Sequence, residues 1–178
     1  APLGVPVHNG IRAWTPVSKD RAVAFASNTI SGTKPYEILS FGFSKTAVCT
    51  APRTLVAGRR TLTGASCVWI GDAAKPYGIV VALFQEQGPS GTKISISTAK
   101  FNASGAVAGG WHVLLEWTPD KSWYLSGVDF VASRGGKSVG IVAALNFYRR
   151  DMSACWGQVL FMEDDLADGR PVVVAQEI

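Results

Sequence analysis

The chain has 178 residues, of which 47% are hydrophobic and only 17% are charged, and its formal net charge is +4. This length suits one domain with a single core. The net charge is compatible with a nucleic-acid partner, but the positive charges are scattered and no run of them resembles a nucleic-acid-binding arm. Because a typical globular domain is about 25% charged, the chain has little material for a fully solvated surface. Two interpretations stay open: other subunits cover part of the exterior, or the core is unusually large.

The first half of the chain begins without any periodic pattern. Residues 1–20 are therefore expected to form an arm with little regular structure. The next segment, residues 21–27, alternates, with Val23 and Phe25 on one face, and is predicted to be a strand. Residues 35–45 are predicted to form a short helix, because Pro35 suits a first helical turn.

Five later segments are rich in β-branched and aromatic residues. They are predicted strands, at residues 65–72, 77–85, 93–99, 122–131 and 137–148. The last of them is apolar on both faces, which is typical of a strand covered once by its own core and once by something else. The acidic segment that follows, residues 162–169, is interpreted as part of a loop or C-terminal tail over residues 162–178.

Turn signals separate these segments, since the chain contains 19 glycines and 9 prolines. We therefore predict an all-β fold, an antiparallel eight-stranded jelly-roll β-sandwich with one short helix, as a single domain over residues 1–178. No apolar run approaches the ~20 residues of a membrane helix, and no signal peptide opens the chain. We expect no membrane partner.

Trp117 and Trp123 lie on either side of a turn made by Pro119 and Asp120. In a sandwich, both rings are expected to close the gap between the sheets at one end. The alternative is that exposed aromatic rings contact a ligand or receptor.

The sequence offers little for catalysis or metal binding. Its only histidines are His8 and His112, and His112 is interpreted as a strand-edge residue rather than a general base. Three cysteines, Cys49, Cys67 and Cys155, are odd in number and widely spaced. They are expected to be small buried residues of a reducing compartment rather than zinc ligands. We expect no enzymatic activity, no cofactor and no metal.

One motif resembles a known family. It is a Trp, five residues, a second Trp, an aromatic residue and Leu, here WTPDKSWYL. With other segments in the same order, the chain is similar to the small coat protein of comoviruses and fabaviruses, plant viruses with picornavirus-like shells. The likeness runs from Arg21 to about Phe161 and departs from the family at Ser44, where Trp is frequent. Its other segments are RAVAFASNTISG, YEILSFGFSKTAV, TLVAGRRTLTGASCVWI, FNASG with GGWHVLLEW, and AALNFYRRDMSACWGQVLF.

The resemblance implies a structural capsid protein, cut from a polyprotein, in the icosahedral shell of a positive-strand RNA plant virus. It would reside in the virion and in the host-cell cytoplasm. The implied partners are four: sister copies in a pentamer at each fivefold axis, a two-domain large coat protein, genomic single-stranded RNA bound without sequence reading, and the viral movement protein.

Within that interpretation, three basic residues near the start are candidates to face the RNA: Arg12, Lys19 and Arg21. Trp117, Trp123 and Tyr124 are expected to be structural aromatics. Two other classes of function stay open. One is a β-sandwich module that binds carbohydrate or a receptor, as in a lectin or a viral protrusion domain. The other is a small hydrolase, which would depend on His112.

Overall fold

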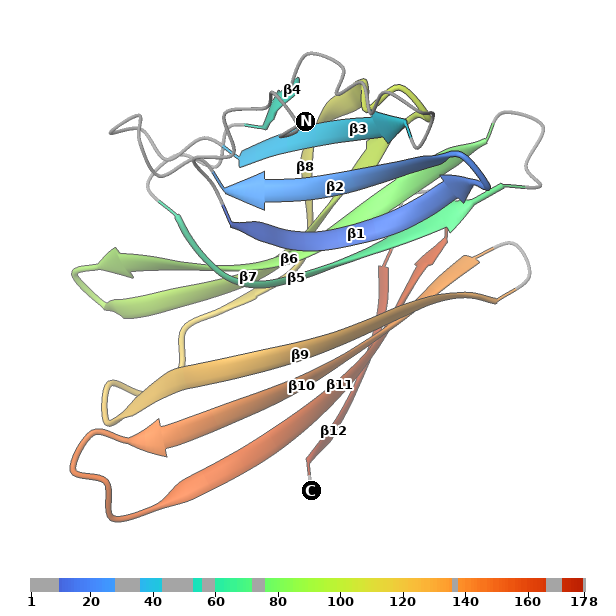
Figure 1. Ribbon diagram of the computed structural model, residues 1–178. Coiled ribbons are helices and arrows are strands. Elements are labelled where there is room, and N and C mark those ends of the chain that lie inside the picture. The colour runs from blue at the N-terminus through green and yellow to red at the C-terminus, as the bar shows by residue number, and fades with distance from the viewer. Residues whose placement is uncertain are drawn as a thin grey trace. The chain divides into compact units, whose positions relative to one another are not determined.

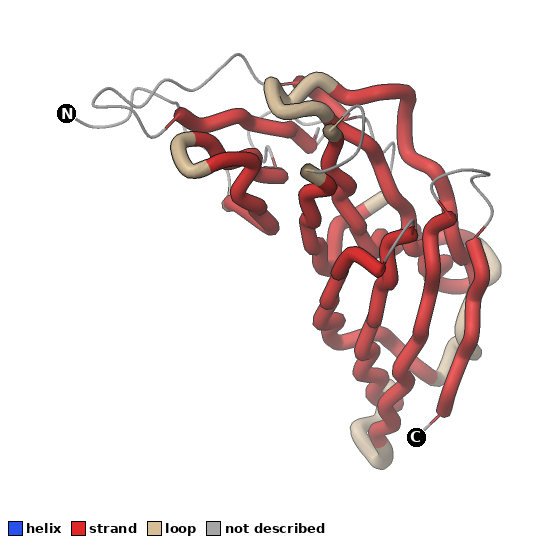
Figure 2. The backbone as a smooth tube through the Cα atoms, turned by 90° about the vertical axis from the view of Figure 1, so that its right-hand side faces the viewer, coloured by secondary structure: helices blue, strands red, loops and turns tan. Residues whose placement is uncertain are grey.

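The protein is all-β in a computed structural model that describes residues 10–27, 36–42, 53–55, 60–71, 76–135, 138–165 and 171–177. Twelve strands and no helix occur in these ranges (Figure 1; Figure 2). The strands are β1 (Ile11–Ser18), β2 (Arg21–Ser27), β3 (Tyr36–Gly42), β4 (Arg53–Leu55), β5 (Thr61–Ile70), β6 (Tyr77–Gly88), β7 (Gly91–Phe101), β8 (Val107–Trp117), β9 (Trp123–Gly135), β10 (Ser138–Arg149), β11 (Cys155–Asp165) and β12 (Pro171–Glu177). The all-β prediction is confirmed, and the predicted count of eight strands is not confirmed.

The strands form three four-stranded sheets, in the orders β1-β2-β3-β4, β5-β6-β7-β8 and β12-β11-β10-β9. Within each sheet, the strands that are hydrogen-bonded to one another are consecutive in the chain, and the pairs with a resolved register are antiparallel. A jelly roll places strands that are distant in sequence side by side. The described pairs contain none of these long-range pairings, so jelly-roll connectivity is not confirmed.

The chain divides into two compact units, where the sequence predicts one domain. The first contains residues 1–59, 66–80 and 99–111, and the second contains residues 60–65, 81–98 and 112–178. Strands β5, β6, β7 and β8 each contribute one end to each unit.

Aromatic side chains form the core of the first unit. The Phe25 ring lies 5.6 Å from the Tyr36 ring and meets the Trp111 ring edge-on at 5.7 Å. The Phe101 ring stacks on Trp69 at 6.2 Å. All of β2 beyond Arg21 is buried, so both faces of this strand are covered.

The second unit is built on the sheet β9-β10-β11-β12. One face of β10 carries Ile141, Ala143, Leu145 and Phe147, all of them buried. The Phe147 ring stacks on Trp156 of β11, with ring centres 4.5 Å apart. This face is the core of the unit, and its buried residues recur at the period of two that a strand imposes.

Three predicted segments differ in the structure. The predicted helix over residues 35–45 is wrong where it is described, because residues 36–42 form strand β3. Tyr36, Ile38 and Ser40 are buried at a period of two and β3 pairs with β2, so tertiary pairing overrides the local signal of Pro35. Residues 35 and 43–45 lie outside the described ranges.

The predicted arm and tail also contain strands. Residues 11–18, expected to be irregular, form β1 along the edge of β2. Residues 162–165 continue β11, and residues 171–177 pair with it as β12. In each case a neighbouring strand satisfies backbone N–H and C=O groups that would otherwise need water.

Over the described residues, the structure has no helix with the length and apolar character needed to cross a membrane.

Candidate functional site

The sheet β9-β10-β11 has a second face, opposite its core, which we call the outer face. Across it runs a row of apolar side chains: Val142 of β10 is paired with Val131 of β9 and with Phe161 of β11. Val131 is 64% exposed and Phe161 is 44% exposed. We call these three residues the apolar row. Exposed large apolar side chains that lie side by side make this row a candidate interaction surface.

The outer face continues along β10 to an aromatic cluster. The Tyr148 ring stacks on Tyr124 of the paired strand at 6.1 Å, and the Tyr124 hydroxyl contacts the Met152 sulfur at 3.4 Å. Met152 is 65% exposed. Between the row and the cluster, the Ser126 hydroxyl donates to the Asn146 carbonyl. This bond lies where the register of the β9–β10 pairing shifts, between Asn146 and Phe147.

Charge is scarce on this surface. Among the described side chains of β9, β10 and β11, the outer face has one charged group, Asp129, which lies opposite Ala144. The prediction that β10 is apolar on both faces is thus confirmed: one face forms the core, and the other presents Val142 and Ala144, both partly exposed.

The structural aromatics predicted from the sequence occupy different places. Trp117 ends β8 and Trp123 begins β9, and these strands belong to different sheets. The Trp123 ring meets Trp156 edge-on at 6.1 Å and is partly buried, so it packs at the border of the core of the second unit. Tyr124 stacks on Tyr148 on the outer face. Closure of a gap between sheets by both tryptophans stays a prediction.

The three basic candidates are not one cluster. Lys19 and Arg21 lie at the turn between β1 and β2, where Ser18 is paired with Arg21, and Asp20 stands between them. Arg12 lies near the other end of β1, where its Nε donates to the Ser27 hydroxyl at 3.1 Å. Lys19 follows Arg12 by seven positions along the chain, which is about 23 Å at 3.3 Å per residue.

The groups that catalysis would need are dispersed. His112 is exposed on β8, and no group of three or more His, Cys, Asp or Glu within the described ranges is placed to hold a metal ion. Burial raises the pKa of the Cys67 thiol to about 12, with a smaller opposite effect from its bond to the Phe25 backbone. Cys155 is exposed, contrary to the prediction of a buried residue. Cys49 lies outside the described ranges.

The register of the second unit's sheet is what the sequence analysis missed. The pattern of residues 137–148 signals a strand with two apolar faces, but it does not show which residues of other strands lie beside Val142. Val131, Phe161 and Met152 therefore were not candidates.

No protein-family model, curated protein or solved structure matches this chain.

Proposed function

We propose that the chain is a structural capsid subunit, the small coat protein of an icosahedral positive-strand RNA plant virus. The observation that carries the proposal is the apolar row on the outer face: Val131, Val142 and Phe161 lie side by side, Val131 and Phe161 exposed and Val142 partly exposed. We assign this face to contact with sister copies of the chain.

Physical chemistry supports self-association through this face. Full burial of a Phe or Val side chain contributes about 1.5–3 kcal/mol, and obligate interfaces resemble a protein core cut in half. The outer face has that character, since Asp129 is its one charged group among the described side chains of β9, β10 and β11. The low charge of the whole chain, 17%, has the same explanation.

The proposal in full keeps the partners that the family resemblance implies. These are the two-domain large coat protein, the genomic RNA and the viral movement protein, with five copies of this chain at each fivefold axis. Jelly-roll pairing of distant strands belongs to the proposal as well, and it rests on the resemblance alone.

Sedimentation velocity with a charged variant tests the proposal. Phe161→Lys places an ammonium group in the apolar row, and we expect it to shift the purified chain from an oligomer toward the monomer. The matched control is Thr118→Lys, which adds the same charge at an exposed loop position away from the row. Circular dichroism checks that both variants keep their strand content.

Two outcomes would contradict the proposal. One is a wild-type chain that stays monomeric as its concentration rises. The other is equal weakening of the oligomer by both variants, because that would show a general effect of charge. A lectin-like module would instead remain a small oligomer and bind sugar, and a hydrolase would lose its activity in His112→Ala.

A further inference from the structure

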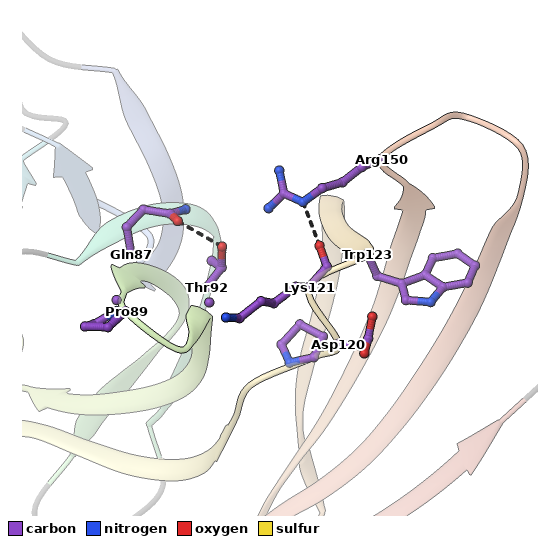
Figure 3. Close-up of a pocket in the computed structure, with 10 residues that line it drawn as sticks. Gln87, Pro89, Thr92, Asp120, Lys121, Trp123 and Arg150 are labelled. Atoms are coloured by element: carbon purple, nitrogen blue, oxygen red, sulfur yellow. Dashed lines mark hydrogen bonds between the residues drawn. The ribbon is translucent and has the colours of Figure 1, made fainter.

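A second site lies in the second unit, away from the apolar row. It is a cavity of about 280 Å³ between two connections of the chain. Gln87 to Thr92, around the turn from β6 to β7, form one wall, and Pro119 to Lys121 of the loop from β8 to β9 form another. Arg150, just after β10, completes it (Figure 3).

Two cations lie on the same side of this cavity. The Arg150 Nε donates to the Lys121 carbonyl at 2.8 Å, and the Arg150 backbone N–H donates to the Ser122 carbonyl at 2.8 Å. The first bond orients the guanidinium, and among the described residues no hydrogen bond uses its two terminal nitrogens. In Figure 3, those nitrogens and the Lys121 ammonium point toward the turn from β6 to β7.

The neighbouring carboxylate, that of Asp120, offsets one of these two positive charges. The Asp120 carboxylate accepts hydrogen bonds from the backbone N–H and the hydroxyl of Ser122, and it points away from the Lys121 ammonium in Figure 3. Within the described part of the chain, neither Lys121 nor Arg150 forms a salt bridge. Asp120 also lines the cavity, so the lining carries two cations, Lys121 and Arg150, and one carboxylate, which leaves a net charge of +1.

The opposite wall, around the turn from β6 to β7, adds a hydrogen-bond donor and lies beside the Lys121 side chain. The Thr92 hydroxyl donates to the Gln87 Oε1 at 3.1 Å, so the amide nitrogen of Gln87 is left to donate to a ligand. Gly91 has a φ of +125°, and a Cβ at this position would lie 3.5 Å from the Lys121 side chain. The positive φ explains the glycine at this position, and the distance is an ordinary van der Waals contact, so the Lys121 stem lies directly beside the turn.

We propose that this cavity binds a phosphate group. An arginine fork and an ammonium match the charge and the several oxygens of a phosphate dianion better than they match a single carboxylate, and the Gln87 amide supplies a neutral donor. The phosphate could belong to a free phosphate monoester or to the backbone of an RNA strand. The site does not depend on self-association through the apolar row.

Calorimetric titration with inorganic phosphate at constant ionic strength tests the site. We expect saturable binding to the wild-type chain and about tenfold weaker binding to Lys121→Gln, since one charge-assisted hydrogen bond is lost. The control is Lys93→Gln, which removes the same charge outside the cavity, where Lys93 pairs with Glu116 at 3.3 Å. Arg150→Lys keeps the charge and loses the fork, so it should also bind more weakly.

Other results of these titrations would either overturn the proposal or identify the source of the phosphate. Absence of saturable binding, or equal weakening by Lys93→Gln and Lys121→Gln, would overturn the proposal. Once phosphate binds, uridine monophosphate and a short oligouridylate separate the two sources: a free ester is favoured if both bind alike, and an RNA backbone if the oligomer binds more tightly and still depends on Lys121. Sedimentation of the same variants reports on self-association separately, so a failure of this site is distinguishable from a failure of the proposed function.

Discussion

At the scale of single residues, the chain uses one local device twice near β9 and β10. Asp120 accepts hydrogen bonds from the backbone N–H and hydroxyl of Ser122, and Asp151 accepts the same two bonds from Ser153. The side-chain hydrogen bonds are the largest reason that the pKa of each carboxyl falls below 3.8. These bonds shape the turns that position Lys121 and Arg150.

The pKa of Asp120 provides a direct test of this turn. Its folded value is lowered, so the carboxylate stabilises the turn above the ordinary value of 3.8 and loses this effect as the pH falls through the lowered pKa. Ser122→Ala removes the hydroxyl, and we expect the pKa of Asp120 to rise toward 3.8 in an NMR titration. Ser126→Ala is the control, because that hydroxyl donates to Asn146 instead. Equal pKa values in wild type and Ser122→Ala would contradict the assignment.

At the scale of elements, the sequence predicts strands where a period of two coincides with β-branched residues. Strand β2 matches its predicted range, and β6, β7, β9 and β10 contain the predicted segments almost entirely. Strands β1, β3 and β12 were not predicted. Their residues form strands because they pair with β2 or β11. An isolated sequence pattern does not contain that information.

Glycine in β6 shows how closely packed the first unit is. A methyl group added at Gly78 would overlap the Phe101 ring, which is itself stacked on Trp69. We expect Gly78→Ala to lower the free energy of unfolding by about 1–3 kcal/mol, because a packed core resists extra volume. Urea denaturation measures the change.

The matched control for that substitution is Gly110→Ala in β8. A Cβ at Gly110 would meet no heavy atom within 4 Å, so its effect should be small. If both substitutions lower the free energy of unfolding by the same amount, the close contact between Gly78 and Phe101 does not explain the loss of stability.

At the scale of the whole molecule, composition predicts the kind of surface but not its location. The 17% charge content indicates a partly covered exterior, and the two apolar faces of residues 137–148 indicate one strand that takes part. The position of the apolar row follows only from the register that brings Val131 and Phe161 beside Val142. The cavity near Lys121 was equally beyond prediction, since its walls come from three separate connections.

The central claim is that sister chains cover the outer face of β9-β10-β11. Hydroxyl-radical labelling, read by mass spectrometry at Phe161 over a range of protein concentrations, tests it most directly. Phe161 is 44% exposed in the single chain, so it should be labelled readily in dilute solution and become protected as the chain oligomerises. Labelling of Phe161 that stays the same in the monomer and the oligomer would contradict the claim.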